Sequence, residues 1–214
     1  MPNWLDTLRQ KAEEVFPESK KIEIPLFPLN SVLFPGGLLR LKVFEARYLD
    51  MASACLNNKT PFGACLISAD QEAGISASPH EIGTTAHITE ADMSQANTLM
   101  LKVHGRHRFR ILSCSTQSNG LLNATVELFD ESENPEMTAV QQDLLPLLKQ
   151  IIDDLGVDKV AKPYVFDSAV WVGYRLAEAL PIQPLAKQKL LELDDPIARL
   201  EIIHAYLTQH RLVK

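Results

Sequence analysis

Two histidines and three arginines lie between positions 104 and 110, and their types are the most suited to chemistry in this sequence. His104 and His107 are three positions apart, a spacing at which two imidazoles can share a metal ion on a helix. A zinc site needs three or four ligands, and no third ligand can be placed beside these two. The adjacent Arg106 and Arg108 would also repel a cation. We therefore expect no metal site and no cofactor.

The same region contains a basic run with the composition of a nucleic-acid patch. Its members are Lys102, Arg106, Arg108 and Arg110. The whole chain has 27 acidic and 21 basic residues, a net charge of −6 that argues against general binding to phosphate backbones. The alternative is a solvated face whose arginines pair with carboxylates across strands, such as Glu127.

The basic run coincides with a pattern that predicts a β-hairpin. Apolar and polar residues alternate in Leu99–His104 and again in Arg108–Ile111. Gly105-Arg106 between them is typical of a tight turn. This hairpin would place Arg106, Arg108 and Arg110 on one face.

Known catalytic motifs are absent from the sequence. It contains no G-x-x-x-x-G-K-[ST] phosphate loop, no G-x-S-x-G elbow and no H-E-x-x-H motif. Cys55, Cys65 and Cys114 form no C-x-x-C pair, and we expect each to be a small buried apolar residue. We predict no catalytic residues.

The predicted secondary structure changes from strands to helices near the middle of the chain. Between Ile22 and Leu128 short runs with a period of two predict about six strands, and Ala46–Leu56 predicts one helix. Six strands with one helix favour a closed or half-closed barrel, because closure protects strand edges. The polar stretch Asp130–Pro135 then separates this part from a helical one.

Apolar residues recur at helical spacing after this stretch. Met137–Leu155 predicts a helix that Pro146 kinks or breaks, and Val165–Leu180 predicts a second one. Further helices are expected to open at Pro184 and at Asp195-Pro196. We divide the chain into an N-terminal helix at 1–20, a β-rich part at 21–131 and a helical bundle at 132–214, which is an α+β fold.

Membrane and targeting segments are not expected. The longest uncharged run, Ile24–Leu39, is shorter than the roughly 20 residues of a membrane helix and contains three prolines. Residues Met1–Phe16 contain several charges and lack the apolar centre of a signal peptide. We therefore expect a cytoplasmic protein without a membrane partner.

Several motifs together resemble the N-terminal, substrate-recognition domain family of Lon protease. The motifs are Ile24–Gly36 (IPLFPLNSVLFPG), Leu39–Tyr48 (LRLKVFEARY), Phe62–Ile67 (FGACLI), Val103–Ile111 (VHGRHRFRI), Ala124–Glu127 (ATVE), Arg175–Glu178 (RLAE) and the region Gln188–Leu200. The resemblance covers about Ile22–Leu207 and is greatest to small stand-alone bacterial members without ATPase and protease modules. It implies a PUA-like β pseudo-barrel followed by a helical bundle.

The resemblance also implies a role without catalysis. In full-length Lon this region helps to recognise and hold protein substrates, whereas the Walker motif and the Ser-Lys dyad belong to other modules. It implies that the partner is unfolded protein, recognised through exposed hydrophobic segments, or a dedicated protein partner, with the domain acting as an adaptor.

Candidate polypeptide-binding residues lie in the proline-rich segment Ile24–Gly36 and just after the strand that follows it. Prolines at 25, 28 and 35 stiffen this segment, from which large apolar side chains project. Most of these side chains belong in a core, and any that stay exposed would bind extended polypeptide. The candidates are Phe27, Leu29 and Phe34 in this segment, and Phe44, Glu45, Arg47 and Tyr48 at the following strand-to-helix junction.

Overall fold

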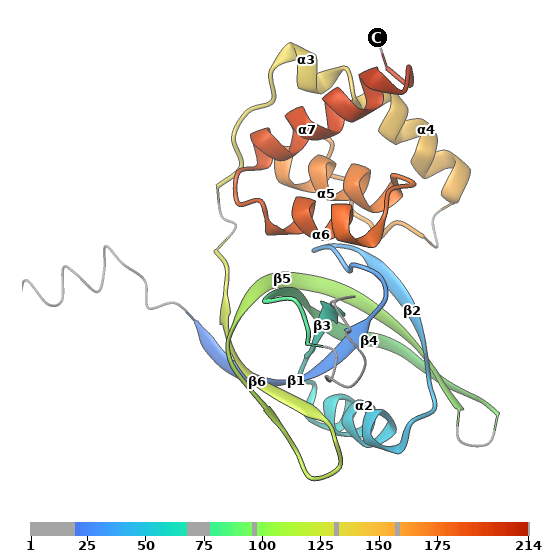
Figure 1. Ribbon diagram of the computed structural model, residues 1–214. Coiled ribbons are helices and arrows are strands. Elements are labelled where there is room, and N and C mark those ends of the chain that lie inside the picture. Colours follow the sequence, from blue (N-terminus) through green and yellow to red (C-terminus); the bar gives the residue numbers. More distant parts are fainter. Residues whose placement is uncertain (1–19, 68–77, 96–97, 131–132, 157–158, 214) are drawn as a thin grey trace, which may run out of the picture.

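The computed structural model describes residues 20–67, 78–95, 98–130, 133–156 and 159–213 (Figure 1). The helix predicted for Met1–Phe16 lies outside these ranges. The fold is α+β, as predicted, with strands in the first part of the chain and helices in the last (Figure 1).

Six strands form the first part of the chain as far as the structure describes it. They are β1 (Lys21–Leu29), β2 (Leu38–Val43), β3 (Phe62–Leu66), β4 (Ile82–Gln95), β5 (Thr98–Thr116) and β6 (Leu122–Leu128). Their order in the sheet is β2-β5-β4-β3-β1-β6, and β5 also pairs with β6. This last pairing closes β1, β3, β4, β5 and β6 into a ring, which we call the barrel, and leaves β2 attached to β5 outside the ring.

Alternating side chains of β1 contribute to two separate apolar clusters. Ile24 and Leu26 belong to one cluster, and Phe27 and Leu29 belong to the other. Because side chains alternate between the faces of a strand, the two clusters lie on opposite faces of β1. The second cluster contains the buried residues of the helix α2 (Ala46–Asn58), which covers the end of the barrel far from the other helices (Figure 1).

The hairpin predicted around Gly105-Arg106 is wrong. β5 runs without interruption from Thr98 to Thr116, and only a bulge opposite Thr85 marks the position of the expected turn. Gly105 is a glycine for a different reason: a Cβ atom there would lie 2.3 Å from the backbone oxygen of Phe34. This glycine therefore serves a close backbone approach rather than a turn.

Among the described residues after β6, five helices follow, and we call them the bundle. They are α3 (Ala139–Gln142), α4 (Leu145–Leu155), α5 (Ala169–Ala179), α6 (Pro184–Glu192) and α7 (Pro196–Gln209). The predicted break near Pro146 is confirmed, since α3 ends before it and α4 carries it in the first turn. Asp195 caps α7 by accepting from the backbone N–H groups of Ile197 and Ala198.

The bundle rests on the barrel through α6 and through the segment between β1 and β2 (Figure 1). Gln188 Nε2 of α6 donates to the Ile82 carbonyl of β4 at 2.9 Å. Thr84 Oγ1 donates to the Leu33 carbonyl at 2.6 Å, which fixes the segment against β4. None of the described helices is both long and apolar enough to cross a membrane.

Candidate functional site

The proline-rich segment does not project from the surface. Phe34 is 0% exposed and packs its ring 5.8 Å from that of Tyr174 in α5. Phe27, Leu29 and Leu33 are buried too. Phe34 is therefore a wedge between barrel and bundle, whereas Phe27 and Leu29 belong to the cluster that α2 covers. None of these three candidates is exposed to bind a polypeptide.

The four candidates after β2 lie together at the surface. Phe44 is 64% exposed, and the neighbouring Glu45 is exposed as well. Arg47 pairs with Glu45 at 2.6 Å and donates to the Gly120 carbonyl at 2.9 Å. Tyr48 is half-buried, with its ring 4.5 Å from that of Phe27. The structure therefore leaves Phe44 as the large apolar side chain of this group that is open to a partner.

The basic run is divided between different environments. Lys102 pairs with Glu90 of β4 at 2.9 Å, as expected for a solvated face. Arg106 and Arg110 are exposed, but Arg108 between them is only 2% exposed. Burial of Arg108 overturns the prediction of one exposed arginine face, because the bundle covers this side of β5.

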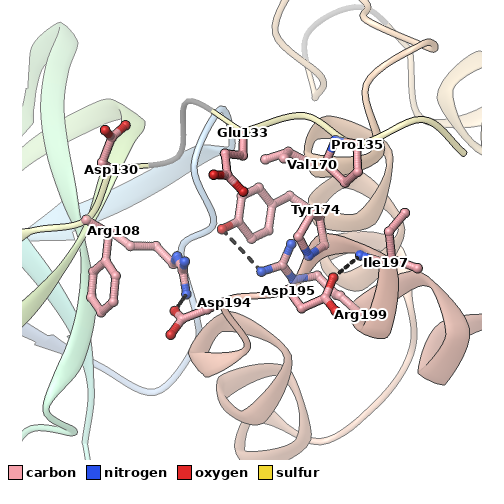
Figure 2. Close-up of a pocket in the computed structure, with 12 residues that line it drawn as sticks. Arg108, Asp130, Glu133, Pro135, Val170, Tyr174, Asp194, Asp195, Ile197 and Arg199 are labelled. Atoms are coloured by element: carbon pink, nitrogen blue, oxygen red, sulfur yellow. Dashed lines mark hydrogen bonds and ion pairs between the residues drawn. The ribbon is translucent and has the colours of Figure 1, made fainter. Parts of the chain in front are cut away.

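Arg108 connects the barrel to the turn between α6 and α7 (Figure 2). Its Nη1 donates to the carbonyls of Leu191 and Leu193 at 2.9 and 3.1 Å, and to Asp194 Oδ1 at 3.1 Å. Arg199 reaches the same turn from α7 through the Leu190 and Leu193 carbonyls. The buried guanidinium groups of Arg108 and Arg199 thus donate to carbonyl groups at the C-terminal end of α6, which have no hydrogen-bond donor within the helix.

A cleft of about 940 Å³ lies over these arginines, between barrel and bundle. Four carboxylates are among its lining residues: Asp130, Glu133, Asp194 and Asp195 (Figure 2). None of its described lining residues is a Ser, Thr, Cys, His or Lys. The hydroxyl among these described lining residues is that of Tyr174, whose oxygen accepts a hydrogen bond from Arg199 Nη2 at 3.4 Å.

The free edge of β2 is a feature that the sequence analysis missed. Within the described residues β2 pairs with β5 alone. Gly105 of β5 donates its N–H to the Gly37 carbonyl, so Gly37 and Gly105 are a hydrogen-bonded pair. The next pair of residues in the register is Leu38 with His104. Bonded and non-bonded pairs alternate in an antiparallel ladder, so Arg40 and Lys42 direct their backbone N–H and C=O groups away from β5.

The cysteines differ in burial, and the histidines form no metal site with other described residues. Cys55 and Cys65 are buried as predicted, but Cys114 is exposed on β5. In the part of the chain that the structure describes, no three His, Cys, Asp or Glu side chains gather closely enough to hold a metal ion.

Comparisons with known proteins point to one family. The profile of the ATP-dependent protease La (LON) substrate-binding domain matches residues 23–209. A crystal structure of a Lon N-terminal domain protein from Xanthomonas campestris has 34% sequence identity and a TM-score of 0.73, and the match covers 86% of this chain and 98% of that one. The N-terminal domain of the Mycobacterium avium complex Lon protease shares the fold, with a TM-score of 0.63 at 18% identity, over 88% of this chain and 100% of that chain.

Longer proteins match through a part of their length. Lon protease 2 of Myxococcus xanthus is 26% identical over 196 residues, which are 88% of this chain and 24% of that protease. Protein cereblon of Gallus gallus is 31% identical over 123 residues, which are 55% of this chain and 26% of cereblon. This chain thus spans about a quarter of the Lon protease that it matches. With a profile match over nearly the whole described chain, this protein belongs to the LON substrate-binding domain family.

Proposed function

We propose that this domain binds extended, hydrophobic segments of unfolded polypeptide and performs no chemistry on them, as an adaptor would. The observation that carries the proposal is the outer edge of β2, which no other described strand pairs with and which is followed directly by the exposed Phe44. An extended chain can pair with such an edge through its backbone. Pairing through the backbone depends little on the sequence of the bound polypeptide. Phe44 adds an apolar contact, and both properties suit a domain that binds unfolded chains.

The alternative, RNA binding through the arginines, has less support. Arg108 is buried, and the Arg110 guanidinium lies over the ring of Phe129 at 5.2 Å. Lys102 is neutralised by Glu90. Few cations of the basic run therefore remain for phosphates, which such binding requires.

Fluorescence anisotropy with a labelled, reduced and carboxymethylated polypeptide tests the proposal. We expect a Kd below about 10 μM, or roughly −7 kcal/mol, with little dependence on salt. A labelled RNA oligomer is titrated beside it at two salt concentrations, and steeply salt-dependent RNA binding without polypeptide binding would contradict the proposal.

Arg40→Pro tests the role of the β2 edge. Proline removes the Arg40 N–H, which points away from β5, and is tolerated on an edge strand in that position. We expect binding of the polypeptide to weaken at least tenfold, whereas the control Arg40→Gln, which keeps the N–H and removes the charge, stays within about twofold. Circular dichroism establishes that the variants are folded. A folded Arg40→Pro protein that binds as tightly as Arg40→Gln would exclude the edge as the site.

A further inference from the structure

A second, smaller pocket of about 280 Å³ lies where β2 meets the bundle. It shares no lining residue with the cleft of Figure 2. Its apolar walls come from β2, α4 and the segment after α4: Leu38, Leu148, Ile151, Ile152, Leu155 and Val160. Leu38 is also the first residue of β2, so the pocket and the free edge form one continuous surface.

The polar end of this pocket is mainly cationic. Lys159, Arg175 and Glu178 line it, and Lys187 lies close by, donating to the Glu178 carbonyl at 2.6 Å. Arg175 Nη1 pairs with Glu178 at 2.8 Å, and Nη2 donates to the Pro35 carbonyl at 2.6 Å. The Nε atom of Arg175 is buried and has no hydrogen-bond partner among the described residues. The two cations that line the pocket, Lys159 and Arg175, together with the nearby Lys187 outnumber the single carboxylate of Glu178, and this excess of positive charge suits an anionic ligand.

The path of the chain fixes where an added strand must end. Gly37 already bonds to Gly105 of β5, and it also forms an isolated antiparallel bridge with Val160. Val160 therefore lies beside Gly37 on the side away from β5, and a strand added along Arg40 and Lys42 must end next to it, beside the pocket. An added strand that runs antiparallel to β2 would have its C-terminal end here, whereas a parallel one would have its N-terminal end.

We propose that the pocket at the Leu38 end of β2 binds the C-terminal residue of an extended polypeptide, with an apolar side chain between α4 and Val160 and the free carboxylate toward Lys159 and Arg175. The surplus of positive charge favours the C-terminal carboxylate of a polypeptide over its N-terminal ammonium group. Because only an antiparallel strand has its C-terminal end at Leu38, this charge also sets the direction in which the polypeptide pairs with β2. This inference rests on the proposed function and specifies its ligand as a polypeptide end. The apolar walls select a side chain such as leucine at that end.

Two peptides that differ in a single group test the inference. Each has eight residues, alternates valine with threonine, ends in leucine and carries an N-terminal fluorophore; one has a free C-terminal carboxylate and the other a C-terminal amide. We expect the free acid to bind at least tenfold more tightly to the wild-type protein in anisotropy titrations. Lys159→Glu should reduce this preference to about twofold or less, while the control Lys20→Glu, another exposed lysine, should retain it.

The outcomes separate this inference from the proposed function. Equal binding of the acid and the amide by the wild-type protein would overturn C-terminal recognition and leave polypeptide binding in place. Failure of both peptides and of the unfolded polypeptide to bind would overturn the proposed function itself. A preference that survives in folded Lys159→Glu would place the carboxylate elsewhere and contradict the assigned pocket.

Discussion

We expect Phe34→Ala to lower the free energy of unfolding by about 3–5 kcal/mol, the usual cost of truncating a fully buried phenylalanine. Phe34 lies in the apolar cluster of the bundle, although it comes from the segment between β1 and β2. Its loss leaves a cavity next to Tyr174, at the contact between barrel and bundle. Urea unfolding followed by circular dichroism measures the change.

The control for this prediction is Phe44→Ala. Phe44 is 64% exposed, so the same truncation should change stability by about 0.5 kcal/mol or less. The same variant should weaken polypeptide binding, since its side chain lies at the end of the free edge. Equal stability losses in the two variants would contradict the wedge described for Phe34.

Arg108→Met should lower the free energy of unfolding by about 1–3 kcal/mol. Methionine keeps most of the apolar stem but leaves the buried Leu191 carbonyl without the Arg108 donor, a loss that typically costs about 1–3 kcal/mol. The Leu193 carbonyl still accepts from Arg199 in this variant. Removal of the buried charge relieves part of this cost, because the guanidinium is itself desolvated.

Arg106→Met serves as the matched control, two positions away on the same strand. Arg106 is exposed, and its replacement should leave the stability within about 0.5 kcal/mol of the wild type. Should the two arginines prove equally important, or equally dispensable, Arg108 would not be the connection between β5 and the α6–α7 turn.

The sequence predicted helices well where their bounds depend on residues within the helix itself. The helix expected at Ala46–Leu56 is found at Ala46–Asn58, and the pair Asp195-Pro196 marks the start of α7. The break near Pro146 was also predictable, because proline removes a helical hydrogen bond at its own position.

The burial of a side chain by a segment far away in the chain could not be predicted from local patterns. Phe34 is buried by α5, whose Tyr174 is far away in the chain, and Arg108 is buried by the turn after α6. Gly105 has the sequence signal of a turn, yet it serves a close approach to Phe34. The free edge of β2 did leave a signal: Arg40 and Lys42 alternate with apolar residues, and exposed basic side chains are typical of edge strands.

Residue-resolved hydrogen exchange tests the central claim, that β2 pairs with unfolded polypeptide, most directly. The amides of Arg40 and Lys42 point away from β5, so they should exchange faster than those of Leu39 and Leu41 in the free protein. Saturation with the reduced and carboxymethylated polypeptide should slow exchange at Arg40 and Lys42 at least tenfold. Unchanged exchange at both amides, in a sample where anisotropy shows the polypeptide bound, would contradict the account.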